Sequence, residues 1–265
     1  MNMGTVFAAL IGLGISLALM IVIWAFSVLR KDASLVDRFW GLGFVLLAWF
    51  WWAVGPQYLA ALVPVVLVTL WGLRLSLYLS WRNWGEGEDR RYQAMRERHG
   101  DGFAKRSLWS VFLLQGAILW LVAYPFLMIG LGHLDPALMQ WWGSAGILLW
   151  VIGFFLETTA DFQLARFKSD PENRGRVMDQ GLWRYSRHPN YFGEICVWWG
   201  FYCFAIPFGG WWTLFAPVLM TFLLVRVSGV TLLERDLKAS KPEYADYVRR
   251  TSALIPWPPR EGRDD

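Results

Sequence analysis

The sequence predicts an all-α integral membrane protein, a bundle of seven transmembrane helices with the N-terminus outside and the C-terminus in the cytoplasm. Three observations support this fold class. Of the 265 residues, 56% are hydrophobic and only 17% are charged, whereas soluble domains carry about 25% charged residues. Apolar runs long enough to cross about 30 Å of hydrocarbon recur along the chain. Basic residues gather in every second connection between those runs.

Apolar runs of roughly 20 residues, the length that a membrane-spanning helix needs, set the predicted number of helices. No basic segment precedes the first run and no cleavage pattern follows it, so we expect a retained helix and not a signal peptide. The positive-inside rule places the basic connections in the cytoplasm. The predicted spans are residues 5–28, 39–55, 59–81, 108–130, 138–160, 190–207 and 211–229.

The same pattern excludes several classes of function. The formal net charge of +4 implies no nucleic acid, because cytoplasmic loops of membrane proteins normally carry excess basic residues. Cys196 and Cys203 lie in one apolar run and fit neither a disulfide framework nor a CxxC metal site. The three histidines are dispersed, so no metal site is predicted. Without a GxGxxG segment after a strand, membrane helices and loops must hold any nucleotide.

Two cytoplasmic connections, residues 80–107 and 161–190, are longer and more polar than the others. Long polar loops in a compact domain are usually functional. The first contains the amphipathic stretch DRRYQAMRERHG, which we expect at the membrane surface; a simple solvated face is the alternative. No linker divides the chain, so we expect one membrane domain, residues 1–265.

The second long connection gathers cations. Arginine binds phosphate through two parallel hydrogen bonds, so this cluster indicates a ligand with several phosphates, such as a dinucleotide. A solvated run of charge is the alternative. The cations are Arg166, Lys168, Arg174, Arg176, Arg184 and Arg187.

The motif RHPNYFGE, which ends the second connection, has the features of a helix start, because proline is favoured in the first helical turn. On this helix Asn190 and Glu194 are four residues apart and share one face. An Asn carbonyl and a carboxylate accept the N–H groups of a primary carboxamide, and the Asn amide donates to the carboxamide carbonyl. The pair therefore predicts a nicotinamide site, with a plain polar contact between helices as the alternative.

The segments GLWRYSRHPNYFGE, ADFQLARFKSDPENRGRVMDQ and RTSALIPW resemble the steroid 5-alpha-reductase-like membrane enzymes, especially a bacterial branch described as a domain of unknown function. The same half of the chain is similar to sterol C14 reductases and, more distantly, to isoprenylcysteine carboxyl methyltransferases. The resemblance implies seven helices in a bacterial inner membrane, NADPH bound from the cytoplasm and a flat apolar lipid admitted from the bilayer. Residues 1–107 would form the substrate-side helices and residues 108–265 the cofactor-binding half.

The family motif assigns residues to the cofactor. It places Asn190 and Glu194 near the nicotinamide, and Lys168 or Arg174 near the phosphates. The tail either closes the cofactor cavity as a lid or acts as a structural cap. The complete set predicted to bind NADPH is Glu157, Asp161, Arg166, Lys168, Arg174, Arg176, Tyr185, Arg187, His188, Asn190, Tyr191, Glu194, Arg226 and Glu234.

The proton donor does not follow from the resemblance, because the Tyr and Glu of the animal steroid reductases do not line up with this chain. Arg74 lies inside the third predicted span, where an unpaired cation is costly and usually faces a partner. Tyr78 and Arg82 follow at helical spacing, and flanking cations make a tyrosine a better acid. We expect Asp37 to pair with Arg74 or to support Tyr78, with a buried structural Arg–Asp pair as the alternative.

Together these features predict an NADPH-dependent reductase of a conjugated C=C bond in a lipid enone, such as a 3-oxo-Δ4 steroid or a related polycyclic or isoprenoid compound. Hydride from the nicotinamide would reach the β carbon while Tyr78, or failing it Tyr185 or Tyr191, polarises the carbonyl. Two alternatives stay open. An S-adenosylmethionine-dependent methyltransferase shares the RHPNY element, and a lipid-binding or transport protein would use Arg74 as a ligand site. The arginines favour the reductase, because S-adenosylmethionine carries no phosphate.

Overall fold

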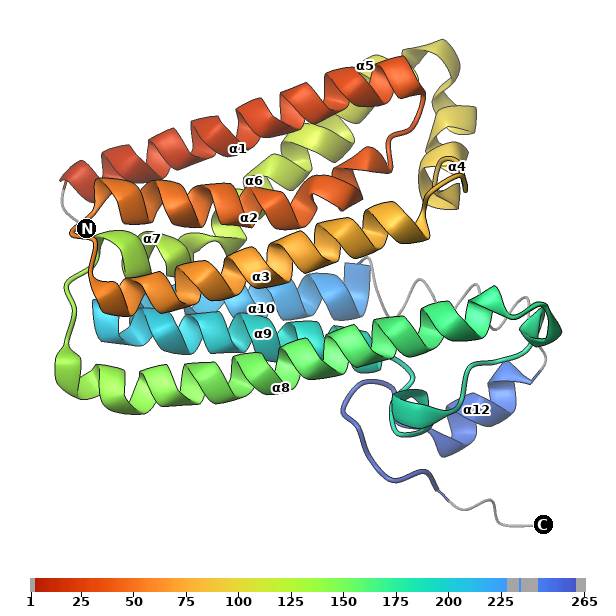
Figure 1. The fold of residues 1–265 in the computed structure, drawn as a ribbon. Helices are drawn as coiled ribbons and strands as arrows, with labels where there is room; N and C mark the ends of the chain where they lie inside the picture. The colour runs from red at the N-terminus through yellow and green to blue at the C-terminus, as the bar shows by residue number, and fades with distance from the viewer. Residues whose placement is uncertain (1–2, 228–233, 235–242, 261–265) are drawn as a thin grey trace. The chain divides into compact units, whose positions relative to one another are not determined.

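The computed structural model describes residues 3–227, 234 and 243–260, and no β-strand occurs among these residues. The all-α prediction is therefore confirmed for the part of the chain that the structure describes (Figure 1). The chain divides into two compact units. The first is Met1–Ala137 with Phe204–Ala216, and the second is Leu138–Cys203 with Pro217–Asp265.

The first unit begins with three long helices, α1 (Met3–Arg30), α2 (Leu35–Val54) and α3 (Leu59–Arg82), which lie side by side in Figure 1. The helices α2 and α3 approach closely at Gly41 and Gly72. A Cβ atom on either glycine would lie 2.7 Å from the backbone oxygen of the other. Small residues at such a crossing allow close packing of helices in a membrane, where dispersion contacts and not the hydrophobic effect hold them together.

Tryptophan indoles tie α1 to the rest of the first unit. Trp51 donates from Nε1 to the carbonyl oxygen of Ala8 over 3.0 Å, and Trp120 donates to that of Ala9 over 2.8 Å. Lipid offers no acceptor to a buried indole N–H, and both of these donors find one inside the protein. Trp51 and Trp120 thus add large apolar surfaces while their polar atoms are satisfied within the protein.

The predicted span 108–130 is a broken helix. A π-helical segment, Leu108–Leu113, leads into α6 (Leu114–Val122), and α7 (Tyr124–Leu131) follows after a bend of 46°. Pro125, in the first turn of α7, has no N–H to continue the hydrogen bonds of α6. The bend therefore has a local cause in the sequence.

The long connection before this broken helix contains α4 (Arg90–His99) and α5 (Phe103–Ser107). The side chain of Asp89 accepts the Arg91 N–H at the start of α4 over 2.9 Å. Gly100 ends the helix at a φ of 50°, which glycine adopts without steric cost. The amphipathic stretch DRRYQAMRERHG is therefore helical over Arg90–His99.

The second unit contains most of α8 (Pro136–Ser169), which is longer than the predicted span 138–160. Its 34 residues reach about 51 Å, well beyond the thickness of the hydrocarbon. The apolar run shows where the chain leaves the membrane, but the polar residues that follow stay helical until Pro171. Arg166 and Lys168 are therefore helical residues and not loop residues, which corrects the prediction.

Three further helices lie wholly or mostly in the second unit. The helix α9 (Pro189–Ala205) begins at Pro189, as the RHPNYFGE motif predicts. The helix α10 (Phe215–Phe222) continues as a π-helical segment, Leu223–Val227, and α12 (Tyr244–Arg250) lies in the tail.

Four helical stretches of the described chain are long and apolar enough to cross a membrane, and the bent pair adds a fifth if it forms one span. The other two predicted spans fall on α2 and α9, which are not among these candidates. The 17 residues of α9 reach only about 26 Å. The helices therefore support a membrane bundle, whereas the seven spans and their orientation stay predictions. The four stretches are Met3–Arg30, Leu59–Arg82, Pro136–Ser169 and Gly210–Val227.

Candidate active site

The polar residues of the second unit gather where α8 meets α9, and two glycines make that contact close. A Cβ atom on Gly193 would lie 2.5 Å from the backbone nitrogen of Glu157, and one on Gly153 would lie 2.5 Å from the Gly193 oxygen. No larger residue fits at this level without moving a helix. Side chains one turn further along therefore meet across a short distance.

Asn190, in the first turn of α9, donates from Nδ2 to Oδ1 of Asp161 on α8 over 3.2 Å. Asp161 is buried, as is Glu157 one helical turn before it. The other amide atom, Asn190 Oδ1, is buried and accepts no hydrogen bond from the described residues. A buried acceptor without a donor costs about 1–3 kcal/mol, and folded proteins rarely contain one. This atom is therefore suited to receive a donor from a ligand.

The structure brings three of the predicted cofactor residues, Glu157, Asp161 and Asn190, to one helix crossing. Glu194 lies one turn after Asn190 on α9 and is half-buried. The sequence paired Asn190 with Glu194, whereas the hydrogen bond of the Asn190 amide goes to Asp161. Sequence spacing identifies residues on one helix, but it does not show which residue of another helix faces them.

The C-terminal tail holds the chain just before α9. Trp257 donates its backbone N–H to the carbonyl oxygen of Tyr185 over 2.9 Å, and the Arg187 N–H donates to that of Ser252 over 2.8 Å. Figure 1 shows α12 beside the end of this segment, and the Tyr247 hydroxyl of α12 bonds to the Trp183 carbonyl. The tail was predicted to be either a lid over the cofactor cavity or a structural cap, and these contacts are typical of a cap.

Arg187 is buried, and its guanidinium is bound within the protein. Its Nε donates to Glu234 Oε1 over 2.7 Å, and its Nη1 donates to the carbonyl oxygens of Val248 over 3.2 Å and Thr251 over 2.5 Å. The sequence predicted Arg187 as a phosphate ligand. The structure places it instead as an anchor for the tail.

His188 faces the same carboxylate, with Nε2 at 3.3 Å from Glu234 Oε1, and its ring stacks on Tyr191. Burial lowers the pKa of His188 to about 4, although the negative charge of Glu234 acts in the opposite direction. Burial by itself would raise the pKa of Glu234, but Arg187 and His188 outweigh it and lower that pKa below its usual value. Near neutral pH the cluster therefore holds a neutral imidazole between charged neighbours.

The remaining predicted phosphate ligands are exposed, so a nucleotide in water can reach them. Arg176 also lines a pocket of about 270 Å³ that sequence reasoning missed. Three carboxylates line this pocket as well. Their negative charge makes the pocket less suited to phosphate than the surface around the other exposed cations. The further lining residues are Val177, Asp179, Glu243, Asp246, Tyr247 and Arg250. The exposed members of the predicted set are Arg166, Lys168, Arg174, Arg176, Tyr185 and Arg226, and Arg184 is exposed too.

In the first unit, Tyr78 lies between two arginines of its own helix, α3. The Cζ atom of Arg74 is 5.3 Å from the centre of the Tyr78 ring, and that of Arg82 is 5.5 Å away. The predicted arrangement of a tyrosine flanked by cations is confirmed. Positive charge near a phenol favours the phenolate, which makes Tyr78 a candidate proton donor.

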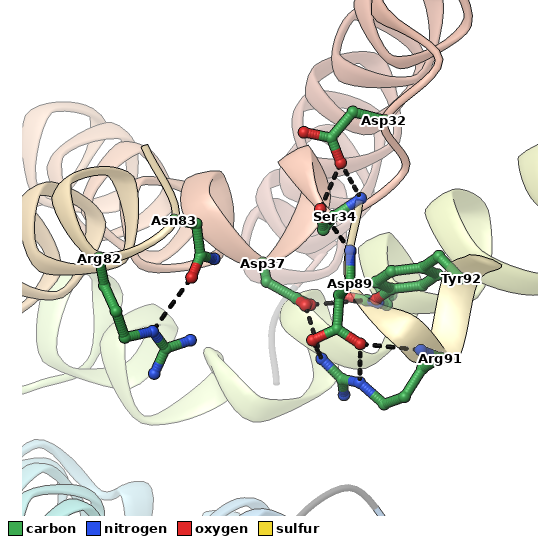
Figure 2. Close-up of polar contacts among 9 residues, drawn as sticks. Asp32, Ser34, Asp37, Arg82, Asn83, Asp89, Arg91 and Tyr92 are labelled. Carbon is green, nitrogen blue, oxygen red and sulfur yellow. Dashed lines mark hydrogen bonds and ion pairs between the residues drawn. The ribbon is translucent and has the colours of Figure 1, made fainter. Parts of the chain in front are cut away.

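Asp37 binds α4, not α3 (Figure 2). Its Oδ2 accepts from Arg91 Nη2 over 2.9 Å, and its Oδ1 accepts from the Tyr92 hydroxyl over 3.1 Å. This corrects the predicted pairing with Arg74 or Tyr78. The physical reason is that α4, in the middle of a polar connection, returns to the start of α2.

Tyr92 is a buried polar residue that sequence reasoning missed. It is 6% exposed and is the buried residue of an otherwise polar helix, the signal that could have identified it. Its hydroxyl donates to Asp37 and lies within 3.4 Å of Gln115 Nε2. Burial and the negative charge of Asp37 raise the pKa of Tyr92 well above its usual value, so this phenol holds its proton tightly. Tyr78 is therefore the better candidate for a proton donor.

The described residues form a helical structure with a buried polar crossing, which is suited to a membrane. A family model described as "Protein of unknown function (DUF1295)" matches residues 23–251, and the chain belongs to this family. No solved structure matches the chain significantly.

Relatives confirm the predicted resemblance to steroid 5-alpha-reductase-like enzymes. An uncharacterized protein of Schizosaccharomyces pombe is 28% identical over 93% of this chain and 79% of its own length. The 3-oxo-5-alpha-steroid 4-dehydrogenase 1 of Bos taurus is 27% identical over 46% of this chain and 43% of that protein. The steroid 5-alpha-reductase DET2 of Gossypium hirsutum is 36% identical over 23% of this chain and 24% of that protein. The alignments thus cover less than half of each of these two named enzymes.

Proposed function

We propose that this protein is an NADPH-dependent reductase of a conjugated C=C bond in a steroid-like or other lipid enone. The names of its relatives, steroid 4-dehydrogenases and a probable 7-dehydrocholesterol reductase of Acanthamoeba polyphaga mimivirus, support reduction of a polycyclic lipid. One observation in the structure carries the proposal: none of the described residues donates a hydrogen bond to the buried Asn190 Oδ1.

The Asn190 amide fits the carboxamide of nicotinamide. Its free oxygen accepts an N–H of that group, and its second N–H, the one not used by Asp161, is available for the carboxamide carbonyl. Glu194 and Glu157 add acceptors on the same helices. The exposed cations after α8 supply charge for the phosphates, and Arg187, already bound to Glu234, contributes to the shape of the site and not to phosphate binding.

The proposed reaction needs a hydride from the cofactor and a hydrogen-bond donor from the protein. NADPH would supply the hydride, which adds to the β carbon of the enone. Tyr78 would donate a hydrogen bond to the carbonyl oxygen, stabilising the enolate, and a proton taken up at the α carbon completes the saturated ketone. Arg74 and Arg82 stabilise the phenolate form of Tyr78 and thereby favour this donation. Asp37 binds Arg91 and Tyr92 and thereby joins α2 to α4 within the first unit. It transfers no proton in the proposed reaction.

The setting of the reaction is part of the proposal. We place the protein in the bacterial inner membrane, with the cofactor entering from the cytoplasm and the lipid from the bilayer. Apolar residues exposed on α1, such as Phe7, Leu10 and Phe26, suit contact with lipid.

The test is to identify the nucleotide that copurifies with the detergent-solubilised protein by mass spectrometry, and then to measure thermal stabilisation by added ligands. NADPH should copurify or raise the melting temperature more than S-adenosylmethionine. Stabilisation by S-adenosylmethionine alone would instead indicate a methyltransferase, and stabilisation by neither would contradict both enzyme classes.

A further inference from the structure

We infer that Glu234 is a positioning residue that acts through Arg187 and His188 to fix the first turn of α9 and aim the Asn190 carbonyl oxygen at the nicotinamide. The inference rests on the proposed function and adds a role for a residue outside the helix crossing.

The first step is the convergence of two side chains on one atom. Glu234 Oε1 accepts from Arg187 Nε at 2.7 Å and lies 3.3 Å from His188 Nε2. The side chains of Arg187, His188 and Glu234 are only 9%, 4% and 12% exposed. A buried carboxylate between two hydrogen-bonding partners holds both in a defined geometry, because loss of either contact would leave charge or a donor unsatisfied.

The second step is the transmission of this geometry to α9. His188 directly precedes Pro189, and its carbonyl oxygen accepts the Phe192 N–H over 3.1 Å, so His188 opens the helix. The ring of Pro189 fixes its φ angle, which leaves little freedom between His188 and Asn190. The His188 ring also stacks on Tyr191, with ring centroids 5.6 Å apart. A displacement of His188 should therefore move Asn190.

The third step separates this role from simple attachment of the tail. The backbone bonds from Ser252 and Trp257 hold residues 185 and 187 without using the Glu234 side chain. A change at Glu234 therefore leaves these attachments in place while removing the contact that reaches His188. Glu234 can be tested without detaching the tail.

The experiment compares two ligands on the full-length protein in detergent. NADPH carries the nicotinamide, whereas 2′-phospho-ADP-ribose has the same phosphates without it. We expect Glu234→Ala to raise the Kd of NADPH by roughly tenfold, the effect of about one good hydrogen bond, and to leave the Kd of 2′-phospho-ADP-ribose unchanged. Glu234→Gln, which keeps the shape, should show the same selectivity with a smaller effect, and it serves if the Ala variant does not fold.

Asp246→Asn is the matched control, because Asp246 is an exposed carboxylate of the same tail that pairs with Arg249. It should change neither Kd. Equal weakening of both ligands in the Glu234 variants would show a purely structural role and overturn the inference, as would unchanged binding of NADPH. If the wild-type protein does not bind NADPH, the proposed function fails and this inference fails with it.

Discussion

Asn190 and Asp161 share a hydrogen bond of 3.2 Å, and within the described part of the chain no group donates to the buried carbonyl oxygen of the Asn190 amide. The bond sets the orientation of the amide, because a flipped Asn190 would place its oxygen against the Asp161 carboxylate. Asp161 thus decides which atom of Asn190 is free for a ligand. An acceptor fixed in this way needs no reorganisation when a carboxamide binds.

Asn190→Ala should separate binding of the nicotinamide from binding of the phosphates. Loss of the acceptor should lower the rate of enone reduction by about 10², the typical cost of lost orientation. The Kd of 2′-phospho-ADP-ribose should stay constant, since its contacts lie elsewhere. Gln180→Ala, which removes an exposed amide of the same connection, is the control and should keep both values. Normal turnover by Asn190→Ala would rule out the carboxamide assignment.

Tyr78→Phe should keep the affinity for NADPH and lower turnover by about 10²- to 10⁴-fold, the usual contribution of general acid catalysis. Steady-state reduction of a 3-oxo-Δ4 steroid and titration with NADPH provide the two readouts. Tyr58→Phe, at the opposite end of α3, should retain activity. A Tyr78→Phe protein that works at the parent rate would move the donor to Tyr185 or Tyr191.

His188 should make the protein less stable in acid. Its folded pKa of about 4 lies below the value of about 6.5 for an unfolded histidine. The unfolded chain therefore binds the extra proton as the pH falls from about 6.5 to 4, and up to about 3 kcal/mol of unfolding free energy is lost across that window. Glu234, with its lowered pKa, adds a further loss below about 4.5.

Melting temperatures measured between pH 7 and pH 4 would check this, with His188→Asn as the test variant. The variant should show a shallower decline than the parent protein over that range. His133→Asn, which changes an exposed histidine, should follow the parent. Parallel curves for His188→Asn and the parent would contradict the assignment of a buried neutral His188.

Gly193→Ala should destabilise the crossing of α8 and α9. The added Cβ atom would lie 2.5 Å from the Glu157 nitrogen, so the helices must separate, at a cost of about 1–3 kcal/mol. Thermal melting in detergent measures the effect. Gly14→Ala, where the added atom meets open space, should be neutral or slightly stabilising. Equal melting temperatures for the two variants would show that the close contact does not form.

Reporter fusions test the predicted orientation. A reporter fused after Arg260 should be cytoplasmic, and one inserted near Asp135 should be periplasmic, because the basic connections lie on the cytoplasmic side under the positive-inside rule. Detection of both reporters on the same side would mean that the chain crosses the membrane an even number of times between them, and not three times as predicted.

The sequence by itself determined what depends on local spacing. It predicted the helical class, the helix that begins at Pro189 and the row of Arg74, Tyr78 and Arg82 on one helix face. These features follow from a period of 3.6 residues and from the chemistry of proline, both of which act over a few residues. Hydropathy located the apolar part of α8 but not its end, because polarity reports the surrounding solvent and not the backbone conformation.

Only the tertiary structure decided which distant residues meet. Asp37 binds Arg91 and Tyr92 because α4 returns to the start of α2, and no spacing rule connects residues more than 50 positions apart. Arg187 anchors the tail, although in the sequence it is an arginine of the same connection as the exposed cations. Asp161 accepts the Asn190 amide N–H, and no residue that the structure describes donates to the Asn190 oxygen. Each outcome depends on which elements pack together, a property of the whole chain that its local sequence does not contain.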